Sequence, residues 1–293
     1  MKQVTLTSPS KINLFLEVLG RRDDGYHEIC SIAVLTELSD TITLERRTSG
    51  ITIWAKDPRV PSGPDNLCYR AADLLLRHSG THGGVSIRIE KQIPIAGGMG
   101  GGSSNAAATL WGLNLLYDLG WPREELIGLG SALGSDVPLF FCREAAFVRG
   151  RGERVEELTA LTPRWLVIAN PGIEILTASV YRRLRLPLTS DKIGVTMRGL
   201  FESGQEEAAL SHCFNRLEDV VLEAYPSVAN LKQRLLLLGA SPVLVSGSGP
   251  TVFGVMREAE MAKRGVSSLI ESGVTAVACR TLDRNPLFLL ADR

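Results

Sequence analysis

The chain has 293 residues, enough for one large domain or two smaller ones, and its apolar content of 44% is typical of a globular protein. It carries 32 basic and 32 acidic residues, so the net charge is zero and neither nucleic acid nor a membrane surface is favoured as a partner. The cysteines are scattered and form no Cys-x-x-Cys pair, which favours free thiols over a disulfide framework or a zinc site: Cys30, Cys68, Cys142, Cys213 and Cys279. With no apolar stretch typical of a signal peptide or a membrane span, a cytoplasmic location is expected.

The first half of the chain predicts strands followed by helices. Apolar residues alternate with polar ones in several segments, so strands are expected at residues 11–20, 40–47, 51–55 and 85–91. Residues 104–120 have apolar side chains at helical spacing and end in Gly-Trp-Pro, which is typical of a helix end. Residues 122–134 predict a second helix.

The pattern starts again near residue 162. Strands are expected at 165–172 and 275–282, two more around a glycine turn at 242–256, and helices at 178–184, 227–239 and 258–273. Residues 148–164 are rich in Gly and Arg and contain Pro, so we interpret them as the crossing between two domains. A boundary at residue 158 would divide the chain into 1–158 and 159–293.

A glycine-rich run lies between the strand at 85–91 and the helix that follows. Backbone N–H groups at such a turn, together with the positive end of the helix, can bind an anion, and phosphate is the natural candidate. A tight turn without a ligand is the alternative. Neither a P-loop nor a dinucleotide fingerprint fits, because Ser103 occupies the position where the first needs Lys and the second needs Gly. The Ser103 and Ser104 hydroxyls could cap the helix and contact a phosphate or its Mg²⁺.

Three motifs carry a family resemblance. Residues 94–107, PIAGGMGGGSSNAA, resemble the phosphate loop of the GHMP kinases, and residues 8–16 and 243–255 resemble the other two motifs of that superfamily. The resemblance implies an α+β fold with an N-terminal ribosomal-protein-S5-like domain and a C-terminal ferredoxin-like domain. It also implies a small-molecule kinase that uses ATP and Mg²⁺ without a dedicated protein metal site, acting as a monomer or homodimer.

Within that superfamily, residues 8–29 are similar to members that phosphorylate the 2-hydroxyl of a cytidine diphosphate-linked methylerythritol. The matching positions are Lys11, Asn13, Arg22, Asp24, Gly25, Tyr26 and His27, with further matches at 65–67, 133–141 and 215–219. The resemblance thus implies a place in non-mevalonate isoprenoid precursor synthesis. Two alternatives are a GHMP kinase for another alcohol and a nucleotide-binding module without catalysis.

The resemblance assigns two residues to the phosphoryl transfer itself. Asp136 is expected to accept the proton of the substrate hydroxyl, although the residue alone could equally be a helix cap ahead of Pro138. Lys11 is expected beside Asp136, where its charge would keep the carboxylate ionised and stabilise the moving phosphoryl group. Without the resemblance, Lys11 could be a surface cation at the start of a strand.

Further residues are expected to bind the two ligands. Tyr26 and Tyr181 would offer aromatic faces to the cytosine, with His27 at the base edge and Asn13 and Thr177 near the substrate, whereas an isolated tyrosine is more often a packing residue. The nucleotide would bind Pro94, Ile95, Ala96, Gly97, Gly98, Met99, Gly100, Gly101, Gly102, Ser103, Ser104 and Asn66. The turn of the C-terminal motif, Gly247, Ser248 and Gly249, is expected next to the site.

The chain departs from the family pattern at a few positions. Ala96 replaces the usual Gly, and we expect a turn with φ below zero to accept its methyl group. Met99 replaces Leu, Ser10 replaces Ala, and neither change removes a donor or a charge. Arg216 lies in the 215–219 motif where the family more often has Asp, and the sequence assigns it no role.

Overall fold

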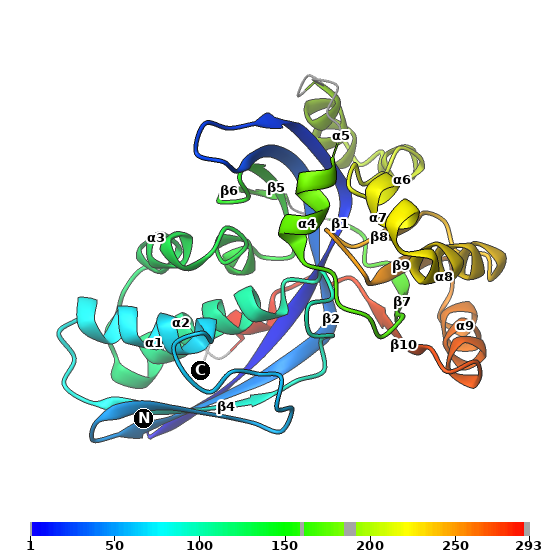
Figure 1. Cartoon of the computed structure of the whole chain (residues 1–293). Helices are drawn as coiled ribbons and strands as arrows, with labels where there is room; N and C mark the ends of the chain where they lie inside the picture. Colours follow the sequence, from blue (N-terminus) through cyan, green and yellow to red (C-terminus); the bar gives the residue numbers. More distant parts are fainter. Residues whose placement is uncertain (1, 159–160, 185–191, 290–293) are drawn as a thin grey trace.

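The computed structural model describes residues 2–158, 161–184 and 192–289 (Figure 1). The strands are β1 (Gln3–Arg21), β2 (His27–Arg47), β3 (Gly50–Ala55), β4 (Gly84–Glu90), β5 (Ala145–Gly150), β6 (Arg154–Leu158), β7 (Trp165–Asn170), β8 (Val243–Val245), β9 (Val252–Met256) and β10 (Thr275–Arg280). The α-helices are α1 (Leu67–His78), α2 (Gly101–Tyr117), α3 (Arg123–Leu133), α4 (Thr177–Arg183), α5 (Lys192–Glu202), α6 (Glu206–Ser211), α7 (Glu218–Ala224), α8 (Pro226–Leu237) and α9 (Ala259–Glu271). Short 3₁₀ turns lie at Pro138–Phe141 and Pro286–Phe288.

The first sheet is built on a long antiparallel hairpin of β1 and β2. Strand β2 pairs with β4 through Thr41–Arg47 and with β5 through Ile29–Val34, which gives the order β3-β4-β2-β5-β6 with β1 also on β2. Helices α1 and α2 cover one face of this sheet, and α3 packs on the outside of these two helices (Figure 1). Fully buried aliphatic side chains such as Leu44, Leu75 and Leu113 fill the layer between the sheet and these helices.

The second sheet has the strand order β10-β7-β9-β8, and all its pairs are antiparallel. With helices between β7 and β8 and α9 between β9 and β10, this is the ferredoxin-like arrangement expected from the resemblance. Helices α8 and α9 pack against this sheet. The two sheets share one apolar cluster, in which Ile12 and Phe15 of β1 pack with Ile168 and Phe253 of the second sheet.

Most of the predicted elements are present, but one interpretation is wrong. Residues 148–158 do not cross between domains, because they form most of a β5–β6 hairpin that completes the first sheet. Gly150 and Gly152 both adopt positive φ at the turn, and Arg149 pairs with Glu156 across the two strands. Glycine and arginine therefore mark a tight hairpin with a charged surface. The boundary at residue 158 stays a prediction.

Two expectations drawn from composition can be compared with the structure. All five cysteines lie in the described residues, and no disulfide joins them. Within residues 2–158, 161–184 and 192–289, no helix is long and apolar enough to cross a membrane. The cytoplasmic location stays a prediction.

Candidate active site

A cavity of about 1130 Å³ lies where β1, the glycine-rich loop and the C-terminal part of the chain meet. A pocket for one small ligand typically measures roughly 300–1,000 Å³, so this cavity is slightly larger than the usual range. Its lining includes Lys11, Asp136, His27, Tyr181 and Ser248, together with the loop from Pro94 to Ser103. Ser104 and Gly249 are the predicted site residues that do not line it.

The glycine-rich loop ends in helix α2, which begins one turn earlier than predicted. Gly100 is the N-cap residue, with φ +70°, and no side chain caps the helix. Ser103 and Ser104 lie in the first turn, so the expected capping role is wrong. The Ser104 hydroxyl is 1% exposed and hydrogen-bonds to Ser8 Oγ at 2.7 Å, which directs it away from the cavity.

Glycine is needed at different positions of the loop for two different physical reasons. A Cβ atom on Gly98 would lie 2.2 Å from the Ser246 carbonyl oxygen, and one on Gly100 would lie 2.7 Å from the Phe140 ring. These glycines are required by close packing within the protein. A Cβ on Gly102 would meet nothing nearer than Leu67 at 3.8 Å, so the backbone there is open on its cavity side.

Ala96 has a different conformation from the one expected. Its φ is +53°, in the left-handed region, whereas a φ below zero was predicted. The turn needs this conformation to bring Gly97 and Gly98 against the C-terminal loop, where Ser246 Oγ donates to the Gly98 carbonyl at 3.0 Å. Alanine adopts the left-handed region at a cost of roughly 1–2 kcal/mol, which glycine would not have at this position.

Lys11 is buried in the cavity wall rather than exposed at the start of a strand. Its Nζ donates to Asn13 Oδ1 at 2.6 Å, and its backbone N–H donates to the Met99 carbonyl of the loop at 3.1 Å. Burial lowers the pKa of Lys11 below its ordinary value, and the nearby Asp136 carboxylate partly opposes that shift. Lys11 and Asp136 thus line the same cavity and interact electrostatically without forming an ion pair.

Asp136 lies in the turn after α3 and does not act as a helix cap. The 3₁₀ turn that follows has Val137 at its N-cap position with no side-chain hydrogen bond. The Asp136 carboxylate lines the cavity. A carboxylate held there can accept a proton from a bound hydroxyl.

The residues expected around the cytosine line the same cavity as Lys11 and Asp136. The rings of His27 and Tyr181 are 4.9 Å apart and tilted by 32°. Burial, and to a lesser degree the Asp136 charge, raises the pKa of Tyr181. Tyr26 is 52% exposed, and Thr177 Oγ1 hydrogen-bonds to Ser248 Oγ at 2.8 Å. Their roles in binding stay predictions.

Asn66 lines the cavity, but its side chain already has two partners. Its Oδ1 accepts from the Cys68 N–H at 2.8 Å, which caps helix α1, and its Nδ2 donates to the Pro61 carbonyl at 2.7 Å. A contact between Asn66 and a nucleotide therefore has to use the remaining N–H or lone pair. The structure gives Asn66 a capping function that the sequence analysis did not consider.

A buried polar network beneath the loop was missed in the sequence. Asp40 is 0% exposed, accepts from the backbone N–H groups of Gln92 and Ile93, and forms an ion pair with Lys91. Asn105 links Asp40 to Ser8 through its amide group. The sequence signal that could have indicated this network is Lys91, a lysine shortly before the glycine-rich loop. The network fixes the strand that leads into the loop.

Arg216 also has a function. It forms a two-pronged ion pair with Glu17, at 2.7 and 2.8 Å, and Glu17 is 1% exposed. These hydrogen bonds raise the pKa of Arg216. The neighbouring Asn215 donates to the carbonyls of Val245 and Gly247, so this segment connects β1 to the C-terminal glycine turn.

Comparisons with known proteins agree with this geometry. The model for the GHMP kinases N terminal domain matches residues 66–144, and that for the GHMP kinases C terminal domain matches residues 197–274. The 4-diphosphocytidyl-2-C-methyl-D-erythritol kinase of Geobacter metallireducens is 43% identical over 273 residues, covering 93% of this chain and 96% of the relative. The chain belongs to the 4-diphosphocytidyl-2-C-methyl-D-erythritol kinase family.

Solved structures support the same family. A crystal structure of 4-(cytidine 5'-diphospho)-2C-methyl-D-erythritol kinase aligns with a TM-score of 0.80 and 34% identity, covering 94% of this chain and 98% of the other. A homoserine kinase from Cytophaga hutchinsonii aligns with a TM-score of 0.75 at 16% identity, covering 97% and 96%, and shows the common fold. Membership of this family thus accounts for the GHMP kinase fold and for the N-terminal motif at residues 8–29.

Proposed function

We propose that the chain transfers the terminal phosphoryl group of ATP to the 2-hydroxyl of 4-diphosphocytidyl-2-C-methyl-D-erythritol. The observation that carries the proposal is that Lys11, Asp136 and the glycine-rich loop line one cavity, with Tyr26 and His27 in the same lining. Curated relatives at 40% identity or more carry the name of this kinase and match along nearly their whole length. The substrate is a small molecule with an alcohol group as acceptor.

Phosphoryl transfer requires positioning and charge neutralisation more than covalent chemistry by the protein. Backbone N–H groups at the open Gly102 side of the helix α2 N-terminus would hold the phosphate oxygens. Asp136 would accept the proton of the attacking hydroxyl. Lys11, next to it, would stabilise negative charge that develops on the transferred group.

The residues around the loop fit a metal that arrives with the nucleotide. No cluster of three or more His, Cys, Asp or Glu suitable for a metal occurs in the described ranges, so the protein would supply few ligands of its own. Ser103 lines the cavity and can offer its hydroxyl, whereas Ser104 is already bonded to Ser8. Bound Mg²⁺ would neutralise phosphate charge and usually keeps several waters.

The decisive variant is Asp136→Asn. Transfer of labelled phosphate from ATP should fall by about 100-fold or more, because the hydroxyl loses its proton acceptor. The ATP affinity measured by calorimetry should stay within a factor of about 2 of wild type, since Asp136 is not one of the loop residues expected to bind the nucleotide. Equal turnover by the variant and the wild type would remove Asp136 from the mechanism.

A panel of acceptor alcohols tests the substrate. The wild-type chain is incubated with labelled ATP, Mg²⁺ and, separately, the cytidyl diphosphate substrate, mevalonate or homoserine. We expect transfer to the cytidyl compound alone. Transfer to mevalonate or homoserine instead would indicate a different GHMP kinase, and ATP binding without any transfer would indicate the non-catalytic alternative.

A further inference from the structure

The cavity lining is strongly basic although the whole chain is neutral. Its cations are Lys11, Arg21, Arg59, Lys91, Arg151 and Arg182, whereas its carboxylates are Asp65 and Asp136. Some of these cations are engaged inside the protein: Lys91 pairs with buried Asp40, and Arg59 pairs with Asp57 at 2.7 Å. Lys11, Arg21, Arg151 and Arg182 have no ion pair among the described residues, and of these Arg151 lies next to both Tyr26 and the residue that adjoins Asp136.

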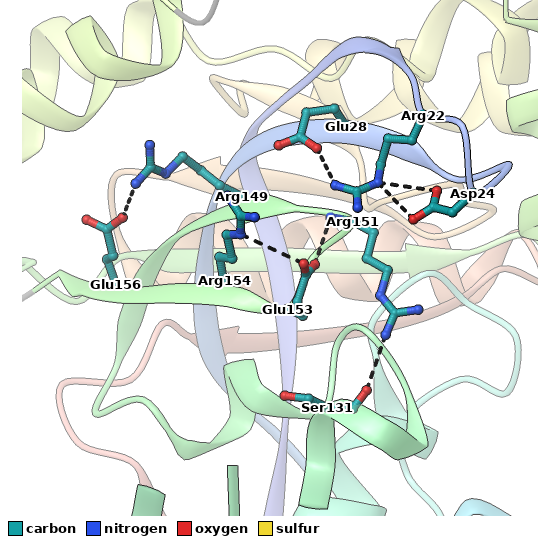
Figure 2. Close-up of polar contacts among 9 residues, drawn as sticks. All are labelled: Arg22, Asp24, Glu28, Ser131, Arg149, Arg151, Glu153, Arg154 and Glu156. Atoms are coloured by element: carbon teal, nitrogen blue, oxygen red, sulfur yellow. Dashed lines mark hydrogen bonds and ion pairs between the residues drawn. The ribbon is translucent and has the colours of Figure 1, made fainter. Parts of the chain in front are cut away.

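Arg151 projects from the tip of the β5–β6 hairpin (Figure 2). Its backbone is held tightly, because its N–H donates to Glu153 at 2.8 Å and glycines with positive φ flank it on both sides. The other two arginines of the hairpin form ion pairs with glutamates: Arg149 pairs with Glu156 at 2.5 Å, and Arg154 pairs with Glu153 at 3.9 Å. The Arg151 side chain has no carboxylate within ion-pair distance among the residues that the structure describes.

The guanidinium of Arg151 has two weak direct contacts in the protein, and beyond ion-pair distance it interacts electrostatically with the exposed Asp24 carboxylate. It lies 5.1 Å from the centre of the half-exposed Tyr26 ring, and one of its nitrogens donates to the Ser131 carbonyl at 3.4 Å. A hydrogen bond that long and a cation–π contact at an exposed ring are both readily exchanged for a charged partner. The neighbouring Arg22 is different, because Asp24 and Glu28 both bind it (Figure 2).

The position of Arg151 defines the kind of group it can bind. On one side is Tyr26, in the part of the cavity assigned to the cytosine, and on the other the next residue, Gly152, abuts Asp136. A Cβ on Gly152 would lie 3.4 Å from Asp136 Oδ1, so the hairpin tip also borders the site of proton transfer. Arg151 therefore lies in the same cavity lining as Tyr26 and Asp136, at a hairpin tip that adjoins both residues.

We propose that Arg151 is a binding residue for the diphosphate linker of the acceptor substrate and sets a preference for diphosphate-bearing nucleosides. The proposal rests on the proposed function for the identity of the two ends of that substrate. Arginine suits the task because its planar donor fork matches two phosphate oxygens at once. On binding, Arg151 leaves the Tyr26 face, and that face becomes available to the base.

The test is calorimetric titration of cytidine, CMP and CDP into the full-length wild type and into Arg151→Gln. We expect the variant to lose about 10- to 100-fold in CDP affinity, because charge-assisted hydrogen bonds are lost, while cytidine affinity changes less than about 2-fold. The KM for ATP should stay unchanged, which also reports that the variant is folded. Arg151→Lys should recover part of the CDP affinity.

Arg154→Gln is the matched control, since Arg154 is on the same hairpin but does not line the cavity and its side chain is 67% exposed. It should bind all three ligands as the wild type does. Equal losses for cytidine and CDP in Arg151→Gln, a change in the KM for ATP alone, or no change would each overturn the proposal for Arg151. A wild type that binds neither cytidine nor CDP would overturn the proposed function as well.

Discussion

At the scale of single residues, the site depends on a lysine that the fold keeps in an unfavourable environment. Lys11 is 5% exposed and its pKa is lowered by burial, with Asp136 opposing the shift. A base whose pKa is lower in the folded state binds fewer protons there than in the unfolded chain. The free energy of unfolding therefore rises with pH between the lowered value and the ordinary value of 10.5.

Replacing Lys11 by Met should separate catalysis from stability. The rate of phosphoryl transfer should fall by about 100-fold or more, because a preorganised cation is lost. At pH 7 the variant should be as stable as the wild type or more stable, and this advantage should shrink as the pH rises toward 10.5. Denaturant unfolding at pH 7 and pH 9.5 measures the difference. An advantage that does not change with pH would show that burial of the charge is not the cause.

At the scale of elements, the glycine-rich loop serves packing and ligand access at different positions. Gly98 lies directly against the backbone at Ser246 and Gly249 of the C-terminal turn, whereas Gly102 faces open space in the first turn of α2. Sequence patterns do not separate these functions, because both require the absence of a Cβ. The atoms that surround each glycine in the structure distinguish the two functions.

The two glycines should therefore respond differently to alanine. Gly98→Ala should lower the free energy of unfolding by at least about 2 kcal/mol, because its Cβ would overlap a backbone oxygen and its φ is +75°. Gly102→Ala should keep or raise stability, by up to about 1 kcal/mol, since alanine favours helix. It should nevertheless weaken ATP binding, which titration would detect. Unchanged ATP affinity in Gly102→Ala would mean that phosphate oxygens do not approach this backbone.

At the scale of the whole molecule, the site is assembled by contacts between distant parts of the chain. Strand β1 contributes Lys11 and Asn13, and it also pairs with the segment at Asn215 through Leu16. Arg216 fixes this junction through the almost fully buried Glu17. The C-terminal glycine turn, held by Asn215, then lies against the phosphate loop.

Loss of this ion pair should destabilise the protein strongly. Arg216→Ala would leave Glu17 buried without its cation, which costs about 3 kcal/mol in comparable sites. Arg77→Ala is the control, because Arg77 is 72% exposed in its pair with Asp73, and such surface pairs contribute at most about 1 kcal/mol. Chemical unfolding of both variants gives the comparison. Similar losses in the two variants would contradict the importance of the buried pair.

The sequence by itself determined the family, the order of most strands and helices, and a set of candidate residues. It could do so because the motifs at residues 11–13, 94–107 and 134–136 contain the residue types that phosphate binding and phosphoryl transfer need. Hydrophobic periodicity likewise predicted α8 and α9, since each buries one face, whereas α2 is buried on all sides along residues 104–110.

Tertiary structure alone decided what each residue touches. The left-handed φ of Ala96 accompanies packing against the distant C-terminal turn, and the partner of Arg216 is on β1. The hairpin at 145–158 is local, but its place in the sheet depends on pairing with β2. The same holds for Arg151, whose neighbours Tyr26 and Asp136 come from other parts of the chain. Local patterns record backbone and burial preferences, whereas charge pairing and close backbone contact arise when distant segments pack together.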